Sequence, residues 1–163
     1  MLIEILLSTL LTLQQDPFLI TDNKVGQYSF CDDVELFRGE VIEDNEYDVK
    51  IVSLGDEVWI AFDFNEAGIF RIETNSSKYS LESGICPGSS IPDLFKIYPN
   101  IVLDMSFGIS FKLVNEEIYF SVDKDFGDQK ELETYLAEYG LEKLIEEYFA
   151  DADVFSIIVV GSC

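Results

Sequence analysis

The chain aligns with itself without gaps when it is shifted by 58 residues. The clearest matches pair Gly26 with Gly84, Leu36 and Phe37 with Leu94 and Phe95, and Ile60 with Ile118. A register that persists through turns and apolar segments indicates a duplicated structural unit. We therefore predict a single domain over residues 1–163, built of two repeats at 17–74 and 75–163.

Each predicted repeat begins with a tight turn and a short helix. In the first repeat, Asp32 or Asp33 is a candidate N-cap for a helix that ends near Phe37. In the second repeat, Ser89 or Ser90 is the candidate N-cap of a helix over 91–98, because a proline and an aspartate follow in its first turn. Apolar alternation or enrichment in β-branched and aromatic residues then predicts strands at 49–51, 58–62, 69–73, 105–113 and 118–122.

Two further helices complete the predicted fold. An amphipathic helix of about 20 residues is expected at 129–150, with a weak point at Gly140, before a final strand at 154–160. An apolar run at 1–13 predicts an N-terminal helix; as a signal peptide it would lack the usual basic residue and the small-residue cleavage site. The expected fold class is α+β: two tandem helix-plus-antiparallel-sheet units, with an N-terminal helix and a long C-terminal helix before the last strand.

The charge of the chain limits its partners. It has 32 Asp and Glu residues against 10 Lys and Arg residues, which gives a formal net charge of -22. Such a field repels nucleic acids and anionic membranes and attracts basic proteins. We expect a protein partner, no nucleic acid and no membrane insertion. The alternative is that the carboxylates only keep the protein soluble.

The sequence offers little for catalysis. It contains no histidine, which excludes Ser-His-Asp and Cys-His arrangements, and it has no phosphate-binding loop. We therefore expect no enzymatic activity, no cofactor and no metal site. Cys31, Cys86 and Cys163 do not have zinc-site spacing. A Cys31–Cys86 disulfide would suit an oxidising compartment, but we favour reduced thiols in the cytoplasm over a periplasmic location.

One acidic stretch also contains aromatic residues. Carboxylates can steer a basic partner, and aromatic side chains can supply contact energy once water is excluded. The predicted partner-binding residues are Asp32, Asp33, Glu35, Glu43, Asp44, Glu46, Tyr47 and Asp48. The alternative is a solvated loop, in which case the acidic face of the 129–150 helix is the next candidate.

The segment from Gly84 to Pro99 has the pattern G-I-x-x-G-x-S-x-x-D-L-x-x-x-Y-P. This segment, with Phe18 to Gly26 and the later Ile118-Tyr119-Phe120, resembles small bacterial immunity and inhibitor-type proteins with tandem units like the β-lactamase-inhibitor fold. It is also similar to lipoprotein-like periplasmic modules. The resemblance concerns turns and helix caps, and it implies no catalytic residues.

Together these features predict a protein-binding antagonist. An immunity-type or inhibitor protein of this kind would neutralise a basic bacterial toxin or enzyme by covering its active site with an acidic surface. The alternatives are an acidic secretion chaperone, which would use an apolar groove and dimerise, and a periplasmic structural binding module.

Overall fold

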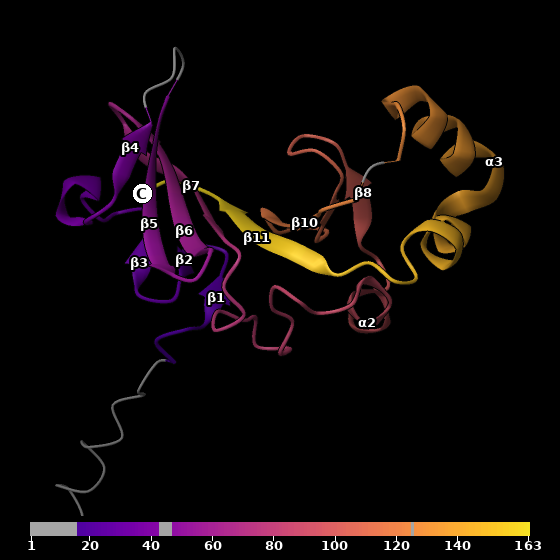
Figure 1. Cartoon of the computed structure of the whole chain (residues 1–163), viewed down its shortest axis with the longest axis horizontal. Coiled ribbons are helices and arrows are strands. Elements are labelled where there is room, and N and C mark those ends of the chain that lie inside the picture. Colours follow the sequence, from indigo (N-terminus) through magenta and orange to yellow (C-terminus); the bar gives the residue numbers. More distant parts are fainter. Residues whose placement is uncertain (1–15, 43–46, 125) are drawn as a thin grey trace, which may run out of the picture.

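The protein is described here by a computed structural model that covers residues 16–42, 47–124 and 126–163. The helix expected at 1–13 lies outside the described residues. The main element is an antiparallel sheet of eight strands in the order β4-β5-β6-β7-β11-β10-β9-β8 (Figure 1). Its strands are β4 (Glu40–Ile42), β5 (Asp48–Gly55), β6 (Val58–Asn65), β7 (Gly68–Thr74), β8 (Val102–Asp104), β9 (Ser110–Lys112), β10 (Ile118–Val122) and β11 (Val154–Val160).

Smaller elements surround this sheet. A second sheet has the order β1-β2-β3, with β1 at Ile20–Thr21, β2 at Lys24–Val25 and β3 at Tyr28–Ser29. The helices of the described residues are the 3-10 helix η1 (Val34–Leu36), α2 (Ile91–Ile97) and α3 (Gln129–Tyr148).

Strand β11 joins the two halves of the large sheet. It pairs with β7 through Ile157↔Thr74 and Val159↔Ile72, and with β10 on its other side. Figure 1 shows β11 running between the β4–β7 strands and the β8–β10 strands. A central strand is covered on both faces, and the apolar run of Val154–Val160 suits that position because Ile157, Ile158 and Val159 are all buried.

The expected α+β class with two tandem helix-plus-sheet units is wrong. The described chain is mostly β, and strands from both halves join in one eight-stranded sheet, beside the small β1–β3 sheet. The first half contributes only the three-residue helix η1, because Phe37 already has an extended backbone and ends the turn. The pairing of β7 with β11 creates the continuous sheet, and strand pairing across 80 residues leaves no mark in local sequence patterns.

When the sequence is shifted by 58 residues, some but not all of the secondary-structure elements fall on elements of the same kind. It superposes η1 on α2, β5 on β9 and β6 on β10, whereas β4 falls four residues short of β8. The matched glycines Gly26 and Gly84 both have positive φ, at 60° and 86°. The division into two repeats, at 17–74 and 75–163, stays a prediction.

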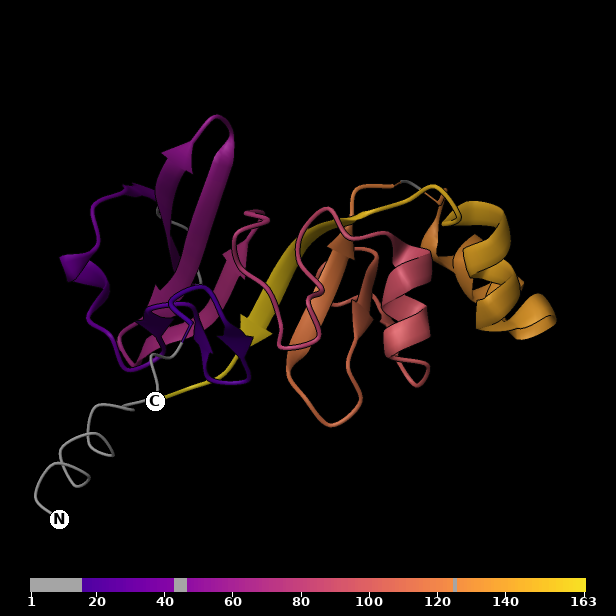
Figure 2. The same cartoon turned by 90° about the horizontal axis from the view of Figure 1, so that it is seen from below.

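A single hydrophobic core lies on one face of the large sheet. The β1–β3 sheet covers the first half, where Tyr28 contacts Phe62 of β6 with ring centroids 5.2 Å apart. Helices α2 and α3 cover the second half, where Phe95 and Phe149 contact Phe111 of β9 at 5.2 and 5.5 Å. Figure 2 shows α2 lying against the β8–β10 strands, with α3 at the end of the molecule. Residues from all these elements belong to one buried cluster.

Local start signals in the sequence match the helices. Ser90 accepts a hydrogen bond from Asp93 N and caps α2, and Asp33 accepts one from Glu35 N and caps η1. Helix α3 begins after Asp128 and is interrupted at Gly140, where φ is 80° and ψ is 171°. This conformation is essentially restricted to glycine, and the break confirms the expected weak point.

The strand expected at 105–113 is mostly absent. Only Ser110–Lys112 forms β9, and the preceding residues form a loop from β8. In that loop Phe107 lies beside Tyr119, with ring centroids 5.0 Å apart, on the sheet face opposite the core. The strict alternation of apolar residues therefore predicted a strand where the chain forms a loop that covers the sheet.

A disulfide closes the fold. It links Cys31, just before η1, to Cys163, just after β11, with Cα atoms 4.7 Å apart, and Cys86 is free. The Cys31–Cys86 pair considered from the sequence is therefore not formed. Bridging requires Cα atoms within about 7 Å, a condition that depends on the tertiary fold and not on sequence spacing.

Candidate functional site

The predicted acidic stretch folds around η1 and the sheet edge at β4. Helix η1 is held on the sheet by Lys50 of β5, whose buried Nζ donates to Val34 O at 3.0 Å. The same ammonium lies 3.9 Å from Glu35 Oε2. Among the described strands, β4 pairs only with β5, and all three of its residues are exposed. We call the surface formed by η1, β4 and the adjoining pocket the η1–β4 surface.

The η1–β4 surface contains an open pocket with a volume of about 470 Å³. Other pockets on the molecule have volumes from about 320 to 590 Å³. Its lining residues are Gln27, Tyr28, Asp32, Leu36, Phe37, Arg38 and Val52. The rings of Tyr28 and Phe37 contact each other at 5.2 Å. Leu36 is 77 % exposed, which is unusual for a leucine beside an aromatic floor. The pocket therefore has a mixed lining, with apolar side chains beside the charged groups of Asp32 and Arg38.

The described carboxylates of the stretch have different roles. Asp32 accepts a hydrogen bond from Ser29 N at 2.7 Å, and Asp33 caps η1. These two side chains stabilise the local backbone as well as adding negative charge. Glu35 is largely exposed, and Asp48 begins β5 in a half-buried position. The structure thus brings Asp32, Asp33 and Glu35 together around η1.

The other predicted residues are placed differently. Glu43, Asp44 and Glu46 lie outside the described residues. Tyr47 packs against Phe70 of β7 in an edge-to-face contact, with ring centroids 5.4 Å apart, so its ring is already partly engaged within the protein. The apolar anchor available at this surface is instead Leu36. In the sequence, Leu36 is distinguished by its place in a short turn flanked by polar residues, next to Phe37.

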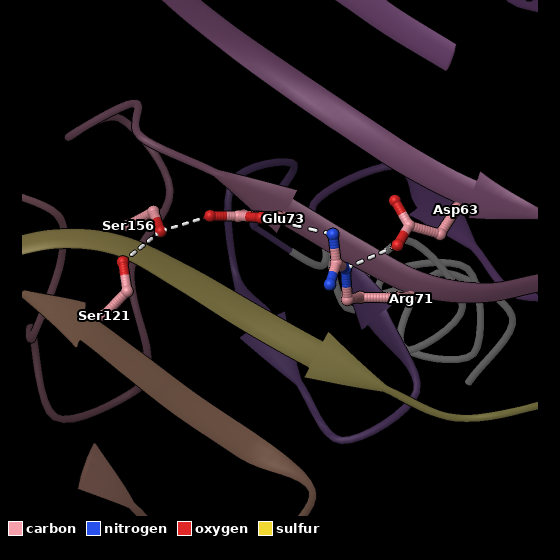
Figure 3. A network of polar contacts seen from close by, with 5 residues as sticks. All are labelled: Asp63, Arg71, Glu73, Ser121 and Ser156. Atoms are coloured by element: carbon pink, nitrogen blue, oxygen red, sulfur yellow. Dashed lines mark hydrogen bonds and ion pairs between the residues drawn. The ribbon is translucent and has the colours of Figure 1, made fainter. Parts of the chain in front are cut away.

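A second polar feature crosses the centre of the large sheet on the face opposite the core. Figure 3 shows a chain of contacts from β6 through β7 and β11 to β10. Asp63 lies 2.8 Å from Arg71 Nε, and Arg71 Nη2 lies 3.9 Å from Glu73. Ser156 donates to Glu73 and makes a further hydrogen bond with Ser121. This network spans the β7–β11 junction, and no local sequence pattern indicates it because its members come from four strands.

Asp63 is the unusual member of this network. Its side chain is 1 % exposed, and neither carboxylate oxygen has a well-directed hydrogen bond, although Arg71 is near. Burial raises the pKa of Asp63 to about 6, against the opposing effect of the Arg71 charge. The Arg71 guanidinium also lies over the Phe107 ring, 5.1 Å from its centroid. The loop from β8 thus covers part of the network.

Within residues 16–42, 47–124 and 126–163, no three carboxylate or thiol side chains are grouped so as to hold a metal ion. No helix in these ranges is long and apolar enough to cross a membrane. The chemistry available at the η1–β4 surface is recognition, through apolar contact and negative charge.

Comparison with known proteins supports the architecture alone. The sequence matches no protein-family model and no curated protein. The fold is similar to the crystal structure of the uncharacterised protein YfeY from Escherichia coli, with a TM-score of 0.50 and 17% sequence identity. The similarity covers 76% of this chain and 80% of that one. No named immunity or inhibitor protein was found among these matches.

Proposed function

We propose that this chain is a protein-binding antagonist that neutralises a basic bacterial toxin or enzyme. The observation that carries the proposal is the η1–β4 surface, where the pocket beside the exposed Leu36 and an open strand edge lie near the carboxylates of η1. A partner would place an apolar side chain beside Leu36 and Phe37, and its basic residues would face Asp32, Asp33 and Glu35. Covering an active site in this way requires no catalytic group in the antagonist.

The open edge of β4 adds a second mode of contact. Edge strands expose unpaired N–H and C=O groups that can pair with an extended segment of another protein. Val41 and Ile42 are exposed on this edge, although β4 is only three residues long. Such a short strand favours a limited contact with one partner over continued self-association.

The disulfide supports the alternative location considered from the sequence. Disulfides persist in oxidising compartments and are rare in the cytoplasm. The Cys31–Cys163 bond joins the η1 segment to the end of β11, so it would hold the η1–β4 surface in place in the periplasm. We therefore propose a periplasmic setting in preference to the cytoplasmic one. Thiol titration of protein isolated without reductant should detect one free thiol per chain.

The proposal can be tested with the immobilised protein and a matched pair of variants. Leu36→Asp removes the exposed anchor, and Val114→Asp introduces the same charge at an exposed aliphatic residue between β9 and β10, in the other half of the molecule. Wild type and V114D should retain a basic protein from the native host, whereas L36D should not. The retained protein should lose its own activity when it is mixed with wild type at a ratio of one to one.

Kinetics with the isolated partner then test the role of charge. The association rate should fall steeply from low salt to 0.5 M, where the Debye length is about 4 Å, while dissociation changes less. Glu35→Gln should slow association, and Leu36→Ala should mainly speed dissociation. Retention by L36D equal to that of wild type, or an association rate independent of salt, would place the interface elsewhere. A partner that stays active when bound would contradict antagonism.

A further inference from the structure

A cluster of aromatic rings lies on α3, far from the η1–β4 surface. Because the helix breaks at Gly140, its second segment turns back toward the first. Tyr148 thereby comes within 5.1 Å of Tyr135 and 4.5 Å of Phe126, measured between ring centroids, and Tyr135 lies 4.7 Å from Tyr139. We call Phe126, Tyr135, Tyr139 and Tyr148 the α3 aromatic cluster.

This cluster lies at the edge of the hydrophobic core, because Phe126 and Tyr135 are partly buried and pack against the core. The side chains that attach α3 to the body are Leu132, Leu144 and Ile145, which are buried. In contrast, Tyr139 is 53 % exposed and Tyr148 is 39 % exposed. Large rings that gather at the surface and remain open to solvent are characteristic of binding surfaces.

The surroundings of the cluster are negatively charged. An open pocket of about 460 Å³ lies beside Tyr135 and Tyr139, and its other lining residues are Asp128, Lys130, Glu131, Thr134 and Glu138. Three carboxylates therefore surround this pocket against one ammonium. The nearby Glu147 is already engaged, because it accepts a hydrogen bond from Tyr135 and pairs with Lys143 at 2.9 Å.

We propose that the α3 aromatic cluster and this pocket bind an arginine side chain from a basic segment of a partner protein. The face of an aromatic ring attracts a cation, and the planar guanidinium stacks on tyrosine while it donates hydrogen bonds to carboxylates. Tyr139 supplies the exposed ring face, and Glu138 and Glu131 supply acceptors. The proposal rests on the proposed function in its choice of a basic protein, but it uses a separate surface.

The probe for the test is a short glycine-rich peptide with two arginines, compared with the same peptide carrying neutral citrulline. Binding is followed by nuclear magnetic resonance of the aromatic ring signals. Wild type should bind the arginine peptide with shifts centred on Tyr135, Tyr139 and Tyr148, and it should bind the citrulline peptide more weakly. Tyr139→Leu should reduce the affinity about 2- to 30-fold, which is the range of cation–π contacts.

Two controls separate this effect from general damage. Phe155→Leu changes another exposed aromatic residue, in β11, and should leave peptide affinity unchanged. Glu138→Gln removes the charge of an exposed carboxylate beside Tyr139, and it should weaken binding and reduce its salt dependence. It tests the pocket even if Y139L does not fold.

Equal binding of the arginine and citrulline peptides would overturn the proposal, as would no binding at all. Shifts confined to residues around η1 and β4 would also overturn it, yet they would support the proposed function. Binding at α3 by a chain that inhibits no basic partner would support the arginine site while the antagonist function fails.

Discussion

Asp63 should make the stability of the protein depend on pH in the direction opposite to that of an ordinary ion-paired aspartate. The proposed change is Asp63→Asn, which keeps the size of the side chain and removes its titration. In wild type the pKa of Asp63 is raised from 3.8 to about 6, chiefly because the carboxyl is buried. A shift of this size corresponds to about 3 kcal/mol. The charged form of Asp63 therefore destabilises the folded state at neutral pH.

The sign and size follow from proton binding. Between pH 4 and 6 the folded state holds the Asp63 proton more tightly than the unfolded state does, so stability rises as the pH falls. With these two pKa values, acidification from pH 7.5 to 5.0 should raise the free energy of unfolding by about 1.4 kcal/mol through Asp63 alone. Other carboxylates add to this change, because the net charge of -22 diminishes at the same time. Only the difference between wild type and D63N isolates Asp63.

The assay is urea unfolding of both proteins at pH 7.5 and 5.0, without reductant so that the disulfide stays closed. Wild type should gain about 1.4 kcal/mol more than D63N over this interval. Asp93→Asn is the control: Lys96 lowers the pKa of the exposed Asp93, so this carboxyl titrates below the assayed interval and D93N should follow the wild-type pH profile between pH 7.5 and 5.0. The reasoning is refuted if wild type and D63N have parallel pH profiles, or if D63N gains more than wild type on acidification.

Two other perturbations test the bonds and turns that shape the molecule. Replacing Cys31 and Cys163 by serine should lower the free energy of unfolding by up to about 5 kcal/mol, because the bond closes a loop of 132 residues; calorimetry should show a reduced melting temperature, and Cys86→Ser should not change it. Gly140→Ala should cost about 1–3 kcal/mol in urea unfolding, because alanine strains the backbone conformation found there. Ala137→Gly in the same helix is the matched control, with a cost of about 1 kcal/mol or less, and a G140A variant as stable as wild type would show that the break does not depend on glycine.

Features encoded by neighbouring residues were predictable from the sequence. The final strand was expected at 154–160 and β11 has these bounds, because an apolar run between acidic and glycine residues has few alternatives. The cap at Ser90 followed from the proline and aspartate after it. The break in α3 followed from Gly140.

Features that depend on the tertiary fold were not predictable. No local pattern indicates that β7 pairs with β11 or that Cys31 bonds to Cys163. The same is true of the polar contacts that connect Asp63 to Ser156 through two intervening side chains. The candidate site was predictable in part. The acidic residues around η1 were identified, whereas the pocket beside Leu36 needed the β2–β3 turn to fold against it.

The position of β11 in the sheet also delays completion of the sheet while the chain is being synthesised. Strand β7 ends at Thr74, and the strand that covers its open edge begins 80 residues later, at Val154. At 5–20 residues per second, a ribosome needs about 4–16 s to make that interval. During this time β7 is an uncovered edge that can pair with the same strand of another nascent chain. Repulsion between the many carboxylates of neighbouring chains opposes such pairing, so the acidic composition protects the growing polypeptide before any partner is present.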